Sequence, residues 1–207
     1  MTREELAKAT HQSNNGKLGD MLMDLVYCDF VSKNNVREKK INSNSAIFQL
    51  VDFYTIFYNT FATKTSNKDH FWKLNIGTPE VNNWYGLAYE RICKAHMPQI
   101  KQSLGIASVA TEHYSWKSKH SSPAAQIDII IDRADALINL CEVKYSESTY
   151  SLDKEEYMKI TNRQNTFKNE TGTNKTIVKT MITTFGLSQG AYSDQIPVQL
   201  DMNALFD

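Results

Sequence analysis

The 207-residue chain has four prolines and three cysteines, and its charges cancel, because 23 basic and 23 acidic residues give a formal net charge of zero. Cys28, Cys93 and Cys141 lie far apart in apolar surroundings, which indicates buried thiols and excludes a disulfide or zinc framework. No stretch approaches the roughly 20 apolar residues of a membrane span. The charged first residues do not read as a signal peptide. These absences favour a cytoplasmic globular protein with no membrane association.

A net charge of zero counts against a nucleic-acid binder, because such proteins are often basic. Two local clusters of basic residues are nevertheless present. Each cluster is a candidate DNA-binding segment or, alternatively, a solvated loop. The candidate residues are Lys33, Arg37, Lys39 and Lys40 in the first cluster, and Lys117 and Lys119 in the second.

The chain also lacks the G-x-x-x-x-G-K-[ST] phosphate loop of many nucleotide hydrolases. The nearest segment, Asn15–Gly16–Lys17–Leu18, does not contain the motif. We therefore expect no ATPase activity from these residues on their own.

The first 52 residues follow the order helix, turn, helix, hairpin. Thr2 and Glu5 form a capping-box pattern, and an amphipathic helix is predicted over 17–28. Strands are predicted over 30–33 and 46–51, on either side of a basic loop. The order resembles a winged-helix domain without its usual first helix, so the chain is expected to begin inside a longer parent protein or at an internal start. Its second helix would contact DNA or, alternatively, the domain would dock only on protein.

The rest of the chain predicts a helical connector over 53–78 and a larger domain over 79–207. The larger domain follows the order α-β-β-β-α-β, which indicates a mixed α/β (α+β) fold with helices packed on the faces of a mixed central sheet. A last short strand is predicted over 196–200. The principal elements are expected at 79–102 (helix), 106–117, 127–131 and 136–143 (strands), 153–171 (helix, capped by Asp153) and 175–185 (strand).

The segment QIDIIIDRADALINLCEVKYS contains two apolar runs around a polar turn, which predicts a β-hairpin. A hairpin folded near Asp135 places Asp128 opposite Glu142. Alternation along the strand gives Glu142 and Lys144 a common face. Two carboxylates and an amine would then meet inside apolar strands, where charges are costly unless they are paired or bound to metal. The alternative is that Asp128 lies on an edge strand and Glu142 with Lys144 forms an exposed rim.

A helix carrying Glu90, followed by Asp128 on the second strand and Glu142-x-Lys144 on the third, resembles the PD-(D/E)XK nuclease superfamily. This resemblance covers roughly residues 79–185 and implies a restriction-endonuclease-like core. Stretches such as LVDFYTIFY, DHFWKLN and TMITTFGL extend it to nearly the whole chain. They resemble the C-terminal winged-helix and nuclease-like region of a family of bacterial AAA+ ATPases frequent in Bacteroidetes.

The resemblance implies a site that binds Mg²⁺ or Mn²⁺ and cleaves phosphodiester bonds. Asp128 and Glu142 would be metal ligands, aided by the Val143 carbonyl and by Glu90. Lys144 would orient the attacking water and neutralise developing charge. Gln126 could bond substrate or a metal-bound water. Arg163 and Gln164, on the following helix, could contact phosphate or could instead belong to a solvated helix face.

Two functions remain in view at the level of sequence. The first is a metal-dependent DNA endonuclease, and the second is a catalytically inactive DNA-binding or protein-interaction module that works with an ATPase. An ATPase module, in the same parent chain or in a partner, and a second copy of the chain are the partners that these functions suggest.

Overall fold

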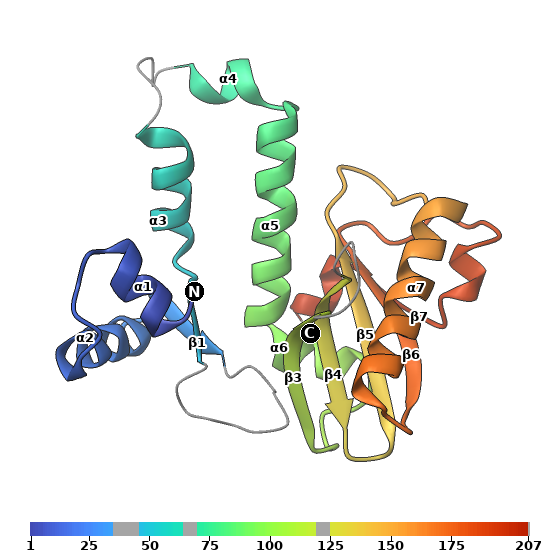
Figure 1. The fold of residues 1–207 in the computed structure, drawn as a ribbon. Helices are drawn as coiled ribbons and strands as arrows, with labels where there is room; N and C mark the ends of the chain where they lie inside the picture. The colour runs from blue at the N-terminus through green and yellow to red at the C-terminus, as the bar shows by residue number, and fades with distance from the viewer. Residues whose placement is uncertain (35–45, 64–69, 119–124, 207) are drawn as a thin grey trace. The chain divides into compact units, whose positions relative to one another are not determined.

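The computed structural model describes residues 1–34, 46–63, 70–118 and 125–206 (Figure 1). The chain divides into two compact units, Met1–Ile76 and Gly77–Asp207. Each unit has its own hydrophobic core.

The N-terminal unit has the helix, turn, helix, hairpin order that the sequence predicts. The Thr2 hydroxyl accepts a bond from the Glu5 N–H, and Glu5 returns a bond to the Thr2 N–H, so the capping box is formed. A small core joins Ala7, Leu18 and Leu22. The elements are α1 (Arg3–Ala9), α2 (Gly16–Tyr27), the antiparallel strands β1 (Val31–Asn34) and β2 (Ile47–Leu50), α3 (Phe53–Phe57) with a π-helical turn over Tyr58–Ala62, and α4 (Phe71–Asn75).

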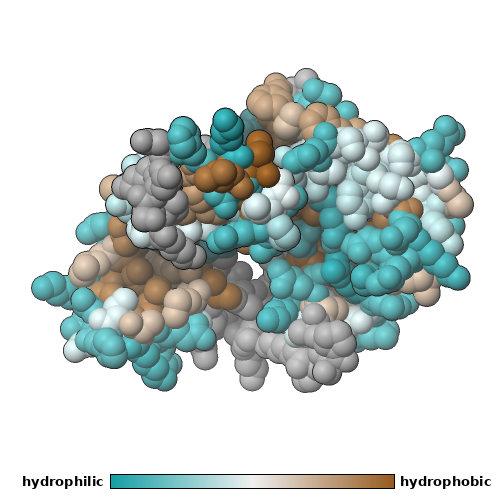
Figure 2. Space-filling model, turned by 90° about the horizontal axis from the view of Figure 1, so that it is seen from above, coloured by the Kyte–Doolittle hydropathy of each residue, from teal (hydrophilic) through white to brown (hydrophobic). Residues whose placement is uncertain are grey.

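An apolar pocket of about 300 Å³ lies within this unit. In Figure 2, hydrophobic residues drawn in brown gather in a hollow at the left of the view. The pocket is lined by side chains of the first two helices and the small sheet, including Leu6, Leu18, Leu22, Leu25, Phe48 and Leu50.

The C-terminal unit has the predicted α-β-β-β-α-β order, and the α+β class with a mixed sheet is confirmed. Two short 3₁₀ turns, Ser193–Gln195 and Met202–Leu205, lie before and after the last strand. The elements are α5 (Pro79–Ala95), α6 (Met97–Ser103), β3 (Thr111–Lys117), β4 (Gln126–Arg133), β5 (Leu137–Lys144), α7 (Lys154–Thr171), β6 (Thr176–Thr183) and β7 (Val198–Leu200).

The sheet has the strand order β3-β4-β5-β6-β7. β3, β4 and β5 pair antiparallel, whereas β5 pairs parallel with β6 and β6 with β7. Helix α7 makes the connection between the parallel strands β5 and β6, as parallel pairing requires. β4 and β5 are therefore interior strands, as their apolar composition predicts.

Helices cover both faces of this sheet (Figure 1). On one face, Cys93 of α5 and Ile100 of α6 pack with Ile129 and Cys141. On the other face, α7 packs against the sheet through a second core. We name these the α5 face and the α7 face. The α7-face core includes Ile127, Ile130, Leu140, Ile160, Phe167 and Met181.

The prediction of one long helix over 79–102 is wrong. The helix ends at His96, whose backbone (φ −104°, ψ 30°) leaves the helical region, and α6 begins at Met97. Pro98 explains the break, because proline has no N–H to donate and its ring crowds the preceding turn. The predicted strand over 106–117 likewise begins later, at Thr111. Among the described residues, no helix combines the length and apolar character needed to cross a bilayer.

We expect Phe167→Ala to lower the free energy of unfolding by about 3–5 kcal/mol, since it leaves a cavity under α7. The Phe167 side chain is 1% exposed, and its ring lies 5.2 Å from that of Trp116. Urea unfolding followed by tryptophan fluorescence measures the change. The matched control is Phe185→Ala, at a position 52% exposed, where we expect a change within about 0.5 kcal/mol. Equal losses in the two variants would contradict the assigned core.

Candidate active site on the central strands

The predicted pair of carboxylates lies at the point where β4 and β5 part. The two strands pair from Asp132↔Ile138 to Ile129↔Cys141. Continuing this register by one residue places Asp128 across from Glu142, as the hairpin predicts. The interior position of both strands and the burial of Glu142 contradict the alternative of an exposed charged rim.

A β-bulge in β4 sets the position of Asp128. Against β3, Ile130 pairs with Tyr114 and Ile127 with Trp116, so Asp128 and Ile129 together oppose a single residue, Ser115. The Ser115 hydroxyl donates to the Asp128 carbonyl at 2.7 Å. The bulge changes the face to which the strand points, because Ile127 belongs to the α7-face core and Ile129 to the α5-face core. Asp128 lies at that change of face, and bulges commonly re-aim a side chain in this way.

The Asp128 carboxylate is half-buried and interacts with charges from both faces. Its Oδ2 accepts the Val143 N–H at 3.0 Å. Burial is the largest influence on its pKa, followed by the negative charge of Glu142, and together with Glu90 they raise the pKa to about 6. The Val143 hydrogen bond and Lys144 act in the opposite direction. A carboxyl group with this pKa is half-ionised in mildly acidic solution, about two pH units above an ordinary aspartate.

The Glu142 carboxylate is almost fully buried, with a side chain 3% exposed, and both of its oxygens are paired. Oε1 lies 3.1 Å from Lys144 Nζ, and Oε2 accepts from Arg163 Nη1 at 2.5 Å. Arg163 belongs to α7, so Glu142 points to the α7 face. A charge buried in this way is tolerated because two cations contact it.

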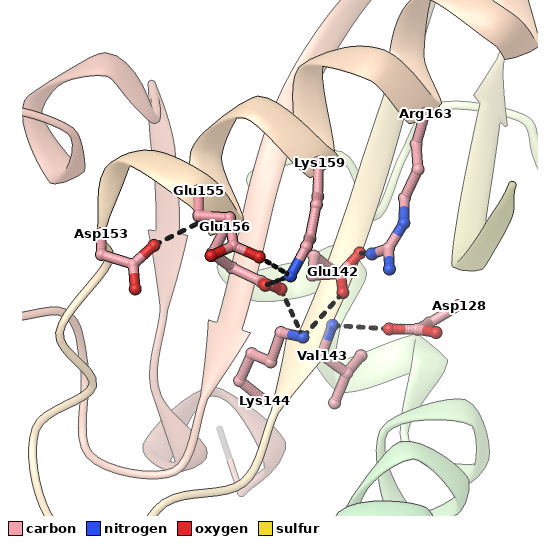
Figure 3. Close-up of polar contacts among 9 residues, drawn as sticks. All are labelled: Asp128, Glu142, Val143, Lys144, Asp153, Glu155, Glu156, Lys159 and Arg163. Carbon is pink, nitrogen blue, oxygen red and sulfur yellow. Dashed lines mark hydrogen bonds and ion pairs between the residues drawn. The ribbon is translucent and has the colours of Figure 1, made fainter. Parts of the chain in front are cut away.

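Lys144, the last residue of β5, connects Glu142 to a second carboxylate on α7. Its Nζ lies 2.7 Å from Glu156 Oε1, so the four side chains form a continuous series, which we name the ion-pair chain: Arg163–Glu142–Lys144–Glu156 (Figure 3). Burial alone would lower the pKa of Lys144, but the pairing with Glu142 and Glu156 outweighs it and raises the pKa. Burial and Glu142 oppose each other in the same way at Arg163, whose pKa is also raised. Lys144 and Arg163 therefore remain protonated at neutral pH.

The N-terminus of α7 places Glu156. Asp153 caps the helix, and its Oδ1 accepts the Glu156 N–H at 2.8 Å. Glu156 thus lies in the first turn, where a carboxylate is stabilised by the helix dipole, and its side chain is 17% exposed. Lys159, one turn later, lies 3.9 Å from Glu156 Oε2. The sequence analysis did not identify Glu156: its position three residues after a capping Asp predicts a place in the first helical turn, but not its contact with Lys144.

The structure also describes four other residues that the sequence predicts for the site. Glu90 is on α5 and pairs with Lys94, and it acts on Asp128 through its charge. Gln126 is exposed at the first position of β4. Val143 contributes its amide N–H to Asp128, where the sequence predicted a role for its carbonyl. Gln164 is half-buried on α7.

The structure describes some of the residues that the sequence predicts to contact DNA. Lys33 is exposed on β1 and Lys117 is exposed at the end of β3. Arg163, predicted to contact phosphate or to lie on a solvated helix face, contacts Glu142 instead. Arg37, Lys39, Lys40 and Lys119 lie outside the described residues.

The carboxylates of this centre are ligands of the chemical type that Mg²⁺ and Mn²⁺ prefer. Mg²⁺ prefers oxygen ligands and is commonly held by one or two carboxylates with retained waters. Asp128 and Glu142 repel each other enough to contribute to the raised pKa of Asp128, and a cation between them would remove that repulsion. Within the described ranges, no group of three carboxylate, imidazole or thiol side chains is arranged to hold a metal ion.

No family model matches the chain, and no curated protein matches it. Among solved structures, the chain is similar to one described as a protein of unknown function, AF1548. The sequences are 16% identical, the TM-score is 0.39, and the match covers 55% of this chain. It covers 64% of that chain, which is less than two thirds of its length. A likeness of this size carries no argument about fold or function.

We expect Asp128→Asn to be more stable than wild type at pH 7.5 by about 1–3 kcal/mol. Because the pKa of Asp128 is raised to about 6, its ionisation destabilises the folded state, and this effect develops as the pH rises from about 4 to about 6. Asparagine keeps an oxygen for the Val143 N–H without the charge. The difference should therefore vanish near pH 4. Urea unfolding in the presence of a chelator, at both pH values, measures it.

The control is Asp135→Asn in the hairpin turn. The side-chain hydrogen bond from Arg133 lowers the pKa of Asp135, so its charge stabilises the fold at neutral pH and this contribution fades on acidification. We expect this variant to be less stable than wild type at pH 7.5, which is the opposite sign. An Asp128→Asn protein that is also less stable at pH 7.5 would refute the assigned environment of Asp128.

Proposed function

We propose that the chain is a metal-dependent phosphodiesterase acting on DNA, and that it forms the C-terminal part of an AAA+ ATPase-type protein. One observation carries the proposal: Asp128 and Glu142 lie on adjacent interior strands, the charge of Glu142 raises the pKa of Asp128, and Lys144 contacts Glu142 directly. Charged groups in the middle of a sheet are unfavourable for stability. Their presence is better explained by chemistry than by structure.

Asp128 and Glu142 are the residues that would hold Mg²⁺ or Mn²⁺. Glu90, whose charge acts on Asp128, would complete the set of ligands directly or through water. The ion would make a bound water more acidic and stabilise negative charge on the scissile phosphate. Asp128 is held for this role by the Val143 N–H at 3.0 Å, which fixes one oxygen and orients the other.

Lys144 is the residue proposed to act on the reacting groups. Glu142 and Glu156 hold its ammonium group from two sides, at 3.1 and 2.7 Å, so its position is fixed before substrate arrives. Its raised pKa keeps it protonated at neutral pH. A fixed cation of this kind orients the attacking water and stabilises charge that develops in the transition state.

The assignment of DNA as substrate rests on the resemblance to the PD-(D/E)XK superfamily and on the helix, turn, helix, hairpin order of the N-terminal unit. The exposed Lys33 and Lys117 are candidates for contacts with the DNA backbone. Such contacts fix the position of the protein and make binding depend on salt. Gln126, exposed at the start of the strand that carries Asp128, is the candidate for a contact closer to the reacting bond.

A second candidate function is a catalytically inactive module that binds DNA or protein and works with an ATPase. The specific observation in its favour is that protein cations already occupy both Glu142 oxygens. DNA binding that persists in a chelator, without turnover in Mg²⁺ or Mn²⁺, would support this function.

We expect wild-type protein to cleave DNA in Mg²⁺ or Mn²⁺, and Asp128→Ala and Lys144→Ala each to lower the rate at least about 100-fold, because each removes a charge needed in the transition state. Supercoiled, linear and single-stranded DNA should be assayed by gel electrophoresis. The matched control is Lys168→Ala, which removes an exposed lysine near the end of α7 and should leave the rate unchanged. Equal rates in all four proteins, or no cleavage of any DNA form, would exclude the nuclease.

A further inference from the structure

Each oxygen of the Glu142 carboxylate already contacts a cation of the protein. Lys144 contacts Oε1 and Arg163 contacts Oε2. The side chain is 3% exposed, so solvent supplies little compensation if either partner leaves. A metal ion that binds Glu142 would therefore compete with one of these two cations for a carboxylate oxygen.

Lys144 and Arg163 differ in the carboxylate contacts that each retains if its contact with Glu142 is lost. Lys144 retains Glu156 at 2.7 Å, whereas Glu142 is the carboxylate within ion-pair distance of Arg163 among the described residues. Lys144 is thus held in place from a second side. Arg163 is held by Glu142, and its side chain is 27% exposed, which gives it room to turn toward solvent.

The position of Asp128 also favours Arg163, and not Lys144, as the cation that a metal ion would displace. The charge of Glu142 raises the pKa of Asp128, and the charge of Asp128 raises the pKa of Arg163, so all three side chains interact electrostatically. A cation that binds both carboxylates would lie close to the guanidinium, and like charges at such distances repel. Displacement of Arg163 removes this repulsion and leaves the contact between Lys144 and Glu156 intact.

We propose that Arg163 is a guard residue, which neutralises the buried Glu142 in the metal-free protein and competes with the divalent cation for its Oε2 atom. This inference rests on the proposed function, because it takes Asp128 and Glu142 as metal ligands. Arg163 acts through Glu142 and is a positioning residue. The ion-pair chain is then the resting state of the site, and opening of the Arg163–Glu142 pair is a condition for metal binding.

The guard has a measurable consequence for metal affinity. When the binding-competent state is populated only in part, the apparent dissociation constant rises by the inverse of that fraction. A pair that is open about one tenth of the time weakens metal binding about tenfold. Removing the guanidinium should therefore tighten metal binding, which is a gain that a merely structural arginine would not give.

The test is calorimetric titration of the full chain with MnCl₂, comparing wild type with Arg163→Ala, Arg163→Lys and Glu142→Gln. We expect Arg163→Ala to bind Mn²⁺ at least about tenfold more tightly than wild type. Arg163→Lys should fall between them, because lysine keeps the charge but loses the guanidinium geometry. Glu142→Gln should lose binding. Arg133→Ala, which removes an arginine paired elsewhere with Asp135, is the matched control and should bind as wild type does.

Thermal melting of the same proteins gives a second readout. Bound Mn²⁺ should raise the melting temperature more in Arg163→Ala than in wild type, since tighter binding stabilises the folded state further. If Arg163→Ala does not fold, the affinity of Arg163→Lys decides. Equal Mn²⁺ affinity of wild type and the Arg163 variants, with binding lost in Glu142→Gln, would refute the role of Arg163 as a guard residue. The same result would still support the proposed metal site. Absence of binding in every protein would overturn both the guard and the proposed metal site.

Discussion

The burial of the Glu142 carboxylate is the constraint on which the arrangement around it depends. A carboxylate in the middle of an apolar sheet requires compensating charge, because an unpaired buried charge is strongly destabilising. Lys144 lies two residues along the same strand and supplies the first cation, and Arg163 of α7 supplies the second. Lys144 in turn requires an anion, which Glu156 provides. The four charges cancel, so the polar centre is neutral as a whole while Asp128 remains outside the series as an additional carboxylate.

The β-bulge connects this centre to the opposite face of the sheet. Because β4 changes face at Asp128, the carboxylate there experiences both Glu142 and the α5 residue Glu90. A regular strand would have kept Ile127 and Ile129 on one face and turned Asp128 to the other. The irregularity thus brings charges from two layers of the protein toward one point. It also explains why Asp128 bonds the Val143 amide at the point where the β4–β5 ladder ends.

The sequence predicts the order of the elements and the register of the hairpin because both depend on local patterns. Alternation of apolar residues locates β4 and β5, and the turn near Asp135 sets Asp128 against Glu142. Three features depend on contacts between distant residues and were not predictable. These are the bulge, which needs the pairing with β3, the Arg163–Glu142 contact across 21 positions, and the position of Glu156 next to Lys144. The break at His96 was in principle predictable, since Pro98 marks it, but the apolar pattern continues through it.

Helix α7 carries both outer members of the ion-pair chain, and it is also the connection between two neighbouring parallel strands. Sliding α7 along the sheet by one turn would move Arg163 and Glu156 by about 5.4 Å. Apolar contacts such as those of Ile160 and Phe167 are non-directional, so they allow small displacements. Paired charges do not, because Glu142 would lose Arg163 and Lys144 would lose Glu156 together. The ion-pair chain therefore adds a directional constraint on the docking register of α7 to the packing of its apolar face.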